Sequence, residues 1–349
     1  MRCFLIACVV LIMACNTAQN SANPSPRTWE FMSSIRALSV ASDGSVWWAG
    51  SNGLIGHSND AGATWRVDTL RLSDGALPAF RSVAVTDEAA FALTIASPAV
   101  LFRQERGSDQ WKPVYTNEDT LAFFDSMHFW DAREGIAMGD PIGGCLSILI
   151  TRDGGNTWAL VPCEDLPPVA SDSTGAREAA FAASNGNIVV QGEEAWVASG
   201  GVASRIFHTA DRGQTWEVTD TPIVQGGAMT GMFSAARCGV HHGIGWGGNW
   251  EAMDDNTANK IHTTDGGRTW ELLTPSEGPG YRSCVQYKPG TDCQEIWAVG
   301  IPGISISNDG GFTWQTEQDS SFYTVRFTGD GSHAWLAGRN QVQCRSLVR

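Results

Sequence analysis

The sequence is short of basic residues: 23 Lys and Arg stand against 37 Asp and Glu, a formal net charge of −14. Nucleic-acid-binding domains carry clustered Lys and Arg. This composition therefore excludes the broad basic surface that binds nucleic acid without sequence specificity. No segment after residue 13 is apolar enough to cross a bilayer, which takes about 20 residues. There is no Cys-x-x-Cys motif and no glycine fingerprint between a strand and a helix, which disfavours redox and dinucleotide chemistry. We therefore expect no cofactor.

Metal-binding patterns are equally weak. His241 and His242 are adjacent, and neighbouring residues of a strand face opposite ways. The acidic insertion 249–260 has oxygen ligands but lacks the regular spacing of a calcium loop, so a solvated acidic loop is the better interpretation. We expect no metal site.

The N-terminus has the pattern of an export signal. Arg2 precedes an apolar run over residues 4–13, which is too short to span a bilayer, and Ile12-Met13-Ala14-Cys15 resembles a bacterial lipobox. An ordinary signal peptide with an incidental cysteine is the alternative. We expect a signal peptide over 1–14, lipid on Cys15, a polar tether over 15–26 and one domain over 27–349.

Tryptophan and glycine are abundant, with 15 and 39 residues, and an octapeptide repeats. The pattern [Ser/Thr]-x-Asp-x-Gly-x-Thr-Trp occurs five times, at 58–65, 151–158, 209–216, 263–270 and 307–314. Asp can accept hydrogen bonds from backbone amides two residues on, Gly supplies a positive φ, and Trp packs between sheets. These roles explain every position through turn formation and packing. The repeated aspartates are therefore poor candidates for catalytic acids.

The repeat spacing predicts the architecture. A degenerate copy at 106–111 fills the first gap, and the tryptophans then recur at steps of 46, 47, 58, 54 and 44 residues. Each step holds about four short strands, which matches one blade of a β-propeller. Residues 322–344 repeat the front of a blade, and residues 27–30 look like its missing outer strand. We expect an all-β, seven-bladed propeller closed by the N-terminal strand, with six blades as the alternative.

The octapeptide resembles the Asp box, or bacterial neuraminidase repeat. The mature chain resembles the photosystem II assembly and stability-factor group of propellers, closest to non-photosynthetic bacterial lipoproteins often labelled "oxidoreductase". The phrases that carry this resemblance are Gly139-Asp-Pro-Ile-Gly-Gly144, Ala180-Phe-Ala-Ala-Ser-Asn-Gly186, Gly247-Gly-Asn-Trp250 and Gly280-Tyr-Arg-Ser283. The resemblance implies a binding or assembly role at the cell envelope, without a proven reaction.

A sialidase resemblance ends at the repeats. The Arg-Ile-Pro phrase is absent, Arg205-Ile206-Phe207 directly precedes a repeat, and the four tyrosines lie in no recognisable phrase. A glycan-processing enzyme stays open as the alternative function. It would need paired carboxylates about 5–10 Å apart. The carboxylates to inspect are Asp125, Asp140, Glu178 and Glu251.

Alignment of the first strands of the blades places charged residues at one equivalent position. This position reads Arg36, Arg81, Asp125, Arg177, Thr230, Arg282 and Thr324 around the ring. First strands line the centre of a propeller, so four arginines are expected to converge on one mouth. They could bind carboxylate or phosphate, or form an internal ion-pair ring with Asp125 and Glu178. Trp250 could stack on a sugar or peptide there, or simply pack.

Six cysteines remain besides Cys15 in the mature chain, which suggests disulfides in an exported protein. Cys145 and Cys163 flank one hairpin turn, and Cys284 and Cys293 flank another, so we expect these two pairs. Nothing local pairs Cys238 with Cys344.

Together these observations favour a monomeric binding propeller of the bacterial envelope. Its membrane contact is the lipid anchor alone, and its partner is an envelope protein or an acidic glycan, recognised at the arginine-lined mouth.

Overall fold

The computed structural model describes residues 25–347. Within them, regular structure is β apart from one 3-10 turn, η1 (Cys163–Asp165), and no helix is long and apolar enough to span a membrane. The expected signal peptide, Cys15 and nearly all of the tether lie outside the described residues.

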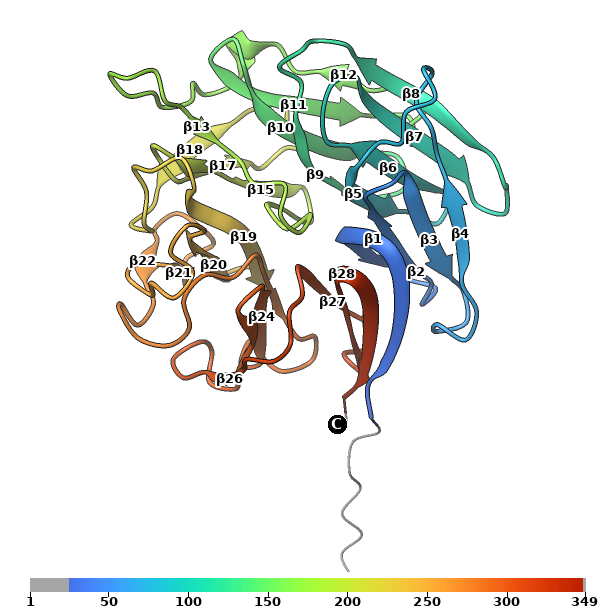
Figure 1. The fold of residues 1–349 in the computed structure, drawn as a ribbon. Coiled ribbons are helices and arrows are strands. Elements are labelled where there is room, and N and C mark those ends of the chain that lie inside the picture. The colour runs from blue at the N-terminus through green and yellow to red at the C-terminus, as the bar shows by residue number, and fades with distance from the viewer. Residues whose placement is uncertain (1–24, 348–349) are drawn as a thin grey trace, which may run out of the picture.

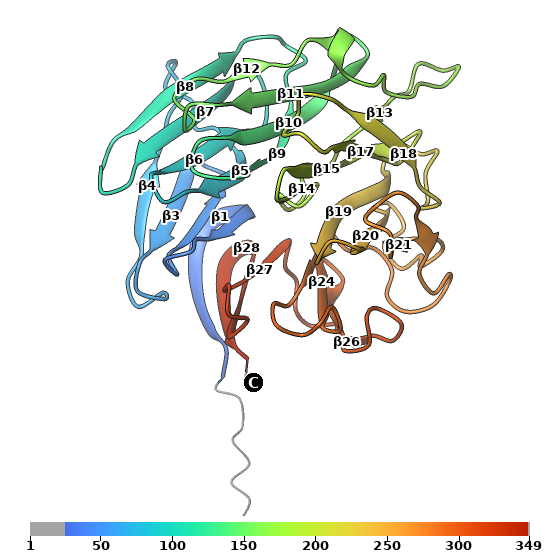
Figure 2. The same cartoon turned by 180° about the vertical axis from the view of Figure 1, so that it is seen from behind.

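The strands form six antiparallel sheets placed as blades around a common centre (Figures 1 and 2). One sheet joins the two ends of the chain through β27 (Thr324–Phe327), β28 (His333–Ser346), β1 (Arg27–Val40), β2 (Val46–Gly50), β3 (Leu54–Ser58) and β4 (Arg66–Thr69). The next two contain β5 (Phe80–Val85), β6 (Ala89–Thr94), β7 (Ala99–Glu105) and β8 (Trp111–Asn117), then β9 (Phe124–Phe129), β10 (Gly135–Ile142), β11 (Cys145–Thr151) and β12 (Ala159–Leu160).

The other three sheets complete the ring. One contains β14 (Ile188–Gln191), β15 (Glu194–Ala198), β17 (Arg205–Thr209) and β18 (Glu217–Asp220). A six-stranded sheet joins β13 (Glu178–Ala179) and β16 (Gly200–Gly201) to β19 (Thr230–Cys238), β20 (His242–Asn249), β21 (Lys260–Thr263) and β22 (Glu271–Leu272). The last contains β23 (Cys284–Tyr287), β24 (Ile296–Gly300), β25 (Gly303–Ser307) and β26 (Gln315–Glu317).

Six sheets is the count stated above as the alternative, and the seven separate blades predicted from the repeats are not observed. The unit split between the termini has no sheet of its own because β1 runs through from it into the first blade. Residues 27–30 of β1 pair with residues 344–341 of β28, and residues 35–40 pair with β2. Figure 1 shows β1 and β28 side by side. The predicted closure by the N-terminal strand is therefore observed, and it leaves no open edge at this point of the ring.

The five octapeptides form five turns with one hydrogen-bond pattern. In the first, Ser58 Oγ donates to Asp60 Oδ1 at 2.8 Å and accepts from the Gly62 amide at 2.8 Å. The Thr64 amide and hydroxyl donate to the two Asp60 oxygens at 2.8 and 2.6 Å. The same bonds recur around Asp153, Asp211, Asp265 and Asp309. Each aspartate is used in its turn, as predicted, but the backbone amide that it accepts lies four residues on and not two.

The core is divided into apolar layers between neighbouring sheets, which is how sheets pack face to face. At the closure, the Trp29 ring of β1 stacks on Trp335 with centroids 5.6 Å apart, and Trp65 packs edge-on against both. The repeated tryptophan therefore buries its ring between blades, and Trp29 extends that packing across the junction of the two termini.

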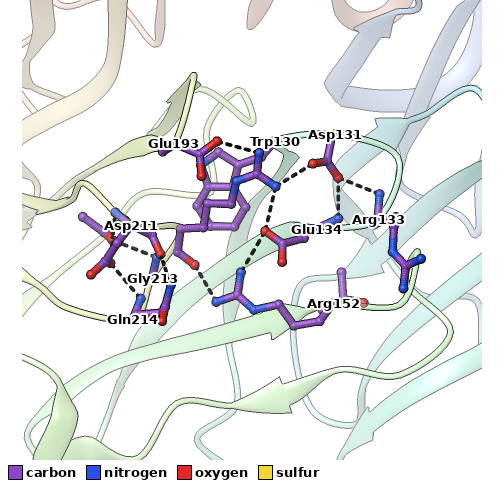
Figure 3. Close-up of polar contacts among 12 residues, drawn as sticks. Trp130, Asp131, Arg133, Glu134, Arg152, Glu193, Asp211, Gly213 and Gln214 are labelled. Carbon is purple, nitrogen blue, oxygen red and sulfur yellow. Dashed lines mark hydrogen bonds and ion pairs between the residues drawn. The ribbon is translucent and has the colours of Figure 1, made fainter.

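Ion pairs tie neighbouring blades at the rim (Figure 3). Arg212 lies in the octapeptide turn at 209–216. Its guanidinium donates to Asp131 Oδ2 at 2.5 Å, Glu134 Oε2 at 2.8 Å and Glu193 Oε1 at 2.8 Å. Arg152 Nη1 lies 3.2 Å from Glu134, and its Nη2 donates to the Arg212 carbonyl at 2.8 Å. These contacts join the blade of β9–β12 to that of β14–β18, so this charged cluster belongs to the fold.

Candidate binding site

Three β-bulges place the central charged residues. The ladder between β1 and β2 skips Arg36, that between β5 and β6 skips Arg81, and that between β9 and β10 skips Asp125. A bulge leaves one residue unpaired and re-aims its side chain. The innermost strands of a propeller run in the same direction. Bulges at equivalent positions therefore bring the three side chains to the same level along the central axis of the ring.

The residues before β14 fill the centre of the ring, and we call residues 181–187 the central segment. Its Asn185 side chain accepts from the Met127 amide at 2.9 Å and donates to the Val83 carbonyl at 3.0 Å. The Gly186 carbonyl accepts from the Ala235 amide at 2.9 Å, and the Ser184 carbonyl accepts from the Thr324 hydroxyl at 3.0 Å. Four different innermost strands therefore hold this segment, which makes the centre a packed structure.

Arg36 and Arg81 lie against the start of the central segment. Arg36 Nη1 donates to the Ala183 carbonyl at 3.4 Å, and Arg81 Nη1 donates to the Ala182 carbonyl at 3.3 Å. The Arg36 guanidinium also lies over the Tyr323 ring, 4.0 Å from its centroid. Burial, followed by the charge of Arg36, lowers the pKa of Arg81 to about 10. Arg81 therefore stays charged at neutral pH and lies close enough to Arg36 for the two guanidiniums to repel each other.

Asp125 is completely buried, and neither of its carboxylate oxygens has a hydrogen-bond partner within residues 25–347. Burial and the charge of Asp140 raise the pKa of Asp125 well above its usual value. Burial also raises the pKa of Asp140 to about 6, against the hydrogen bond that it accepts from the Ala180 amide at 3.1 Å. No ion pair joins Asp125 to Arg36 or Arg81 in the described chain. The two arginines thus keep a net positive charge.

The predicted convergence of four arginines is wrong for two of them. Arg282 is only 2% exposed, and its guanidinium donates to Ser305 Oγ at 2.7 Å and to the Tyr281 carbonyl at 2.7 Å. It precedes β23 and turns along its own sheet toward Ser305 of β25 instead of toward Arg36. Arg177 is exposed, pairs with Ser171 in an isolated bridge, and lies before the central segment. The alignment failed there because the fourth innermost strand begins only at residue 188.

The alternative ion-pair ring does not form either. Glu178 is buried and binds Arg205, whose Nε donates to its two oxygens at 3.0 and 3.1 Å. Glu178 therefore compensates an arginine outside the mouth. Trp250 follows β20 with its side chain 41% exposed, and Glu251 beside it is also exposed. Among the described residues, no cluster of His, Cys, Asp and Glu could hold a metal ion.

One predicted disulfide is observed and the other is not. Cys145 and Cys163 are bonded, with Cα atoms 5.7 Å apart. Cys293 bonds Cys238 instead of Cys284, with Cα atoms 5.6 Å apart, while Cys284 and Cys344 are buried free thiols. The prediction of Cys284–Cys293 is wrong because Cys284 lies inside β23 facing Thr324 of β27, whereas Cys293 lies in a loop beyond that strand. Sequence separation could not reveal this pairing between neighbouring blades.

Sequence reasoning also missed the central segment and Arg326, which donates to the Ser184 and Asn185 carbonyls. The one available signal was the phrase at 180–186, in which a run of small residues leads to Asn and Gly. Small side chains let this backbone pass close to the innermost strands. Asn185 tolerates its positive φ of 56° and supplies both a donor and an acceptor.

No protein-family model matches the chain, and no curated protein matches it. Solved structures match over nearly the whole length. YCF48 bound to a D1 peptide is 18% identical, covers 94% of this chain and 96% of that chain, and has a TM-score of 0.61. YCF48 from Cyanidioschyzon merolae is 15% identical, covers 93% of this chain and 99% of that chain, and has a TM-score of 0.60. U3-55K is 13% identical, covers 94% of this chain and 99% of that chain, and has a TM-score of 0.63.

At these identities the similarity shows a shared β-propeller fold. The YCF48 structures agree at that level with the resemblance to the photosystem II assembly-factor group.

Proposed function

We propose that this chain is a non-catalytic, monomeric binding propeller of the bacterial envelope, anchored through lipid on Cys15, that recognises an anionic protein segment at Arg36 and Arg81. The observation that carries the proposal is the placement of these two guanidiniums by equivalent bulges without a carboxylate ion pair in the described chain. Two like charges held together are costly unless an anion joins them, and Arg matches carboxylate geometry. YCF48, which shares the fold, binds a D1 peptide, and this supports a protein partner over an acidic glycan.

The test measures binding of fluorescein-labelled acidic peptides to the purified mature chain by anisotropy. We expect Arg36→Ala with Arg81→Ala to weaken binding at least tenfold, and Arg→Glu at both sites to weaken it further. Added salt should also weaken binding if the mouth is exposed. The matched control is Arg133→Ala with Arg268→Ala, since both side chains are exposed and remote from the centre. Equal affinity in both double variants contradicts the proposed site.

The anchor is tested separately. Cys15→Ala should move the exported protein from the detergent-extracted membrane fraction to the soluble fraction. A wild-type protein that is already soluble after export refutes lipidation and leaves the binding proposal standing.

A glycan-processing enzyme is the second candidate, favoured only by the raised pKa values of Asp125 and Asp140. A general acid needs a raised pKa, but it also needs access to substrate. Asp125 has 0% exposure, and Glu178 is committed to Arg205, so these carboxylates form no open pair. We expect no turnover of fluorogenic sialosides or other aryl glycosides. Turnover that Asp140→Asn abolishes would favour the enzyme.

A further inference from the structure

A polar cavity lies farther along the innermost strands than Arg36 and Arg81. Its volume is about 400 Å³, within the range of small-molecule sites. Asn185 and Gly186 of the central segment line it, so the segment separates this cavity from the arginine pair. Its other polar lining residues come from five innermost strands: His128, Gln191, Arg237, Gln286, Tyr287 and Arg326.

The cavity is cationic in an acidic protein. Within residues 25–347, two arginines and no Asp or Glu line it. Arg237 forms an ion pair with Glu194, outside the cavity. Arg326 has no carboxylate partner in this part of the chain, and its guanidinium donates to the Asn185 carbonyl and the Val325 carbonyl, both at 2.7 Å. Carbonyl oxygens fix the guanidinium in place but leave its charge uncompensated.

His128 adds no charge to the cavity. Burial, followed by the charge of Arg326, lowers the pKa of His128 to about 4, and its Nε2 lies 2.9 Å from the Asn185 carbonyl. The ring is therefore neutral at physiological pH and donates from Nε2 to that carbonyl. The uncompensated positive charge of the cavity comes from Arg326.

Unused hydrogen-bonding groups face the same space. The side chains of Gln191, Gln286 and Tyr287 make no hydrogen bond in the described part of the protein, although all three line the cavity. Burial raises the pKa of Tyr287, so its hydroxyl remains a donor at neutral pH. Ile188 and Ala235 supply an apolar wall. Uncompensated positive charge, free donors and an apolar wall together match a small organic carboxylate.

The walls are held rigidly. The Cys238–Cys293 disulfide ties the end of β19, next to Arg237, to the loop between β23 and β24, which follows Tyr287. Arg326 is fixed by the central segment. A preorganised site loses little conformational entropy when a ligand binds.

We infer that this cavity binds a carboxylate group carried on a short apolar body, independently of the partner proposed for Arg36 and Arg81. Such a group can come from a free small carboxylate or from the C-terminus of a peptide. Neither Arg36 nor Arg81 lines the cavity, so the two sites can be tested separately in the same protein.

The experiment titrates the purified mature chain by calorimetry with butyrate, succinate, butyramide, and trialanine as its free acid and its C-terminal amide. We expect the carboxylates to bind and the two amides not to bind. Tighter binding of trialanine acid than of butyrate assigns the site to a chain terminus, and the reverse order assigns it to a free small carboxylate. Either order supports a carboxylate site, whereas equal binding of butyrate and butyramide, or no carboxylate binding at millimolar concentration, overturns it.

Variants locate the binding. Tyr287→Phe removes one donor with little change of shape and should weaken binding about tenfold, as should Gln286→Leu. Arg326→Gln should abolish binding, and the Tyr287 variant carries the test if loss of the guanidinium unfolds the centre. Arg268→Ala, whose side chain is exposed and remote from the centre, should leave carboxylate affinity unchanged. Binding that survives both Tyr287→Phe and Gln286→Leu lies elsewhere and refutes the assignment.

Discussion

Asp140→Asn should stabilise the protein at neutral pH and remove part of its pH dependence. The folded protein raises the pKa of Asp140 from 3.8 to about 6, so the folded state retains this proton to higher pH than the unfolded chain does. As pH rises from about 4 to about 6, the unfolded chain loses the proton first and the free energy of unfolding falls. Above about pH 6 both states are ionised, and this contribution stays constant.

The size of the effect follows from the shift. The pKa shift of about 2 units, at about 1.4 kcal/mol per unit, corresponds to about 3 kcal/mol in the free energy of unfolding. The wild-type protein has this stabilisation near pH 4 and lacks it at pH 7. An asparagine introduced in place of Asp140 can still accept the Ala180 amide through its side-chain oxygen, so the substitution removes ionisation while keeping the contact. It also removes a charge that raises the pKa of Asp125, which changes stability in the same direction.

The assay is urea unfolding followed by tryptophan fluorescence between pH 4 and 7.5. Asp74→Asn is the matched control, because Asp74 is exposed and also accepts a backbone amide hydrogen bond. Repeat aspartates such as Asp60 do not interfere: the Thr64 hydroxyl lowers the pKa of Asp60 to about 2, so its contribution is lost only as pH falls from about 4 to 2. If wild type, Asp140→Asn and Asp74→Asn share one slope between pH 4 and 6, the raised pKa of Asp140 is refuted.

Four further perturbations test the fold. Cys238→Ser with Cys293→Ser should lower the free energy of unfolding by about 4 kcal/mol, because that disulfide closes a loop with a sequence separation of 55. Cys145→Ser with Cys163→Ser should lower it by about 3 kcal/mol, because the separation is 18. Guanidinium unfolding measures both, and the reverse order would contradict the dependence on loop length. Glu178→Gln should cost about 3 kcal/mol because it leaves the buried side of Arg205 uncompensated, and an unchanged unfolding midpoint refutes this. Trp29→Ala should cost about 3 kcal/mol by opening the closure, whereas Met32→Ala, 84% exposed, should cost almost nothing. Asp265→Ala should lower the thermal midpoint more than Asp265→Asn, since Asn keeps one acceptor for Thr269, and equal midpoints count against the turn role.

The sequence predicted the features that depend on neighbouring residues. Each octapeptide contains its own turn donors and acceptors, so its hairpin and its buried tryptophan could be predicted locally. The spacing of the repeats predicted one blade for each repeat. The repeat that is split between the termini predicted the closure through residues 27–30, because strand pairing preserves the order of the repeats. The Cys145–Cys163 disulfide followed for the same reason, since the two residues flank one hairpin.

Tertiary structure alone decided the number of sheets, the second disulfide and the composition of the site. The continuity of β1 merges two predicted blades into one sheet, and no local pattern encodes it. Cys238 meets Cys293 because adjacent blades bring together residues that lie 55 apart in the sequence. Bulges select Arg36 and Arg81 from four arginines at similar repeat positions, and the central segment takes the place expected for Arg177. The bulges and the path of the central segment depend on contacts among several blades. A repeat pattern contains only the interactions that form within each blade.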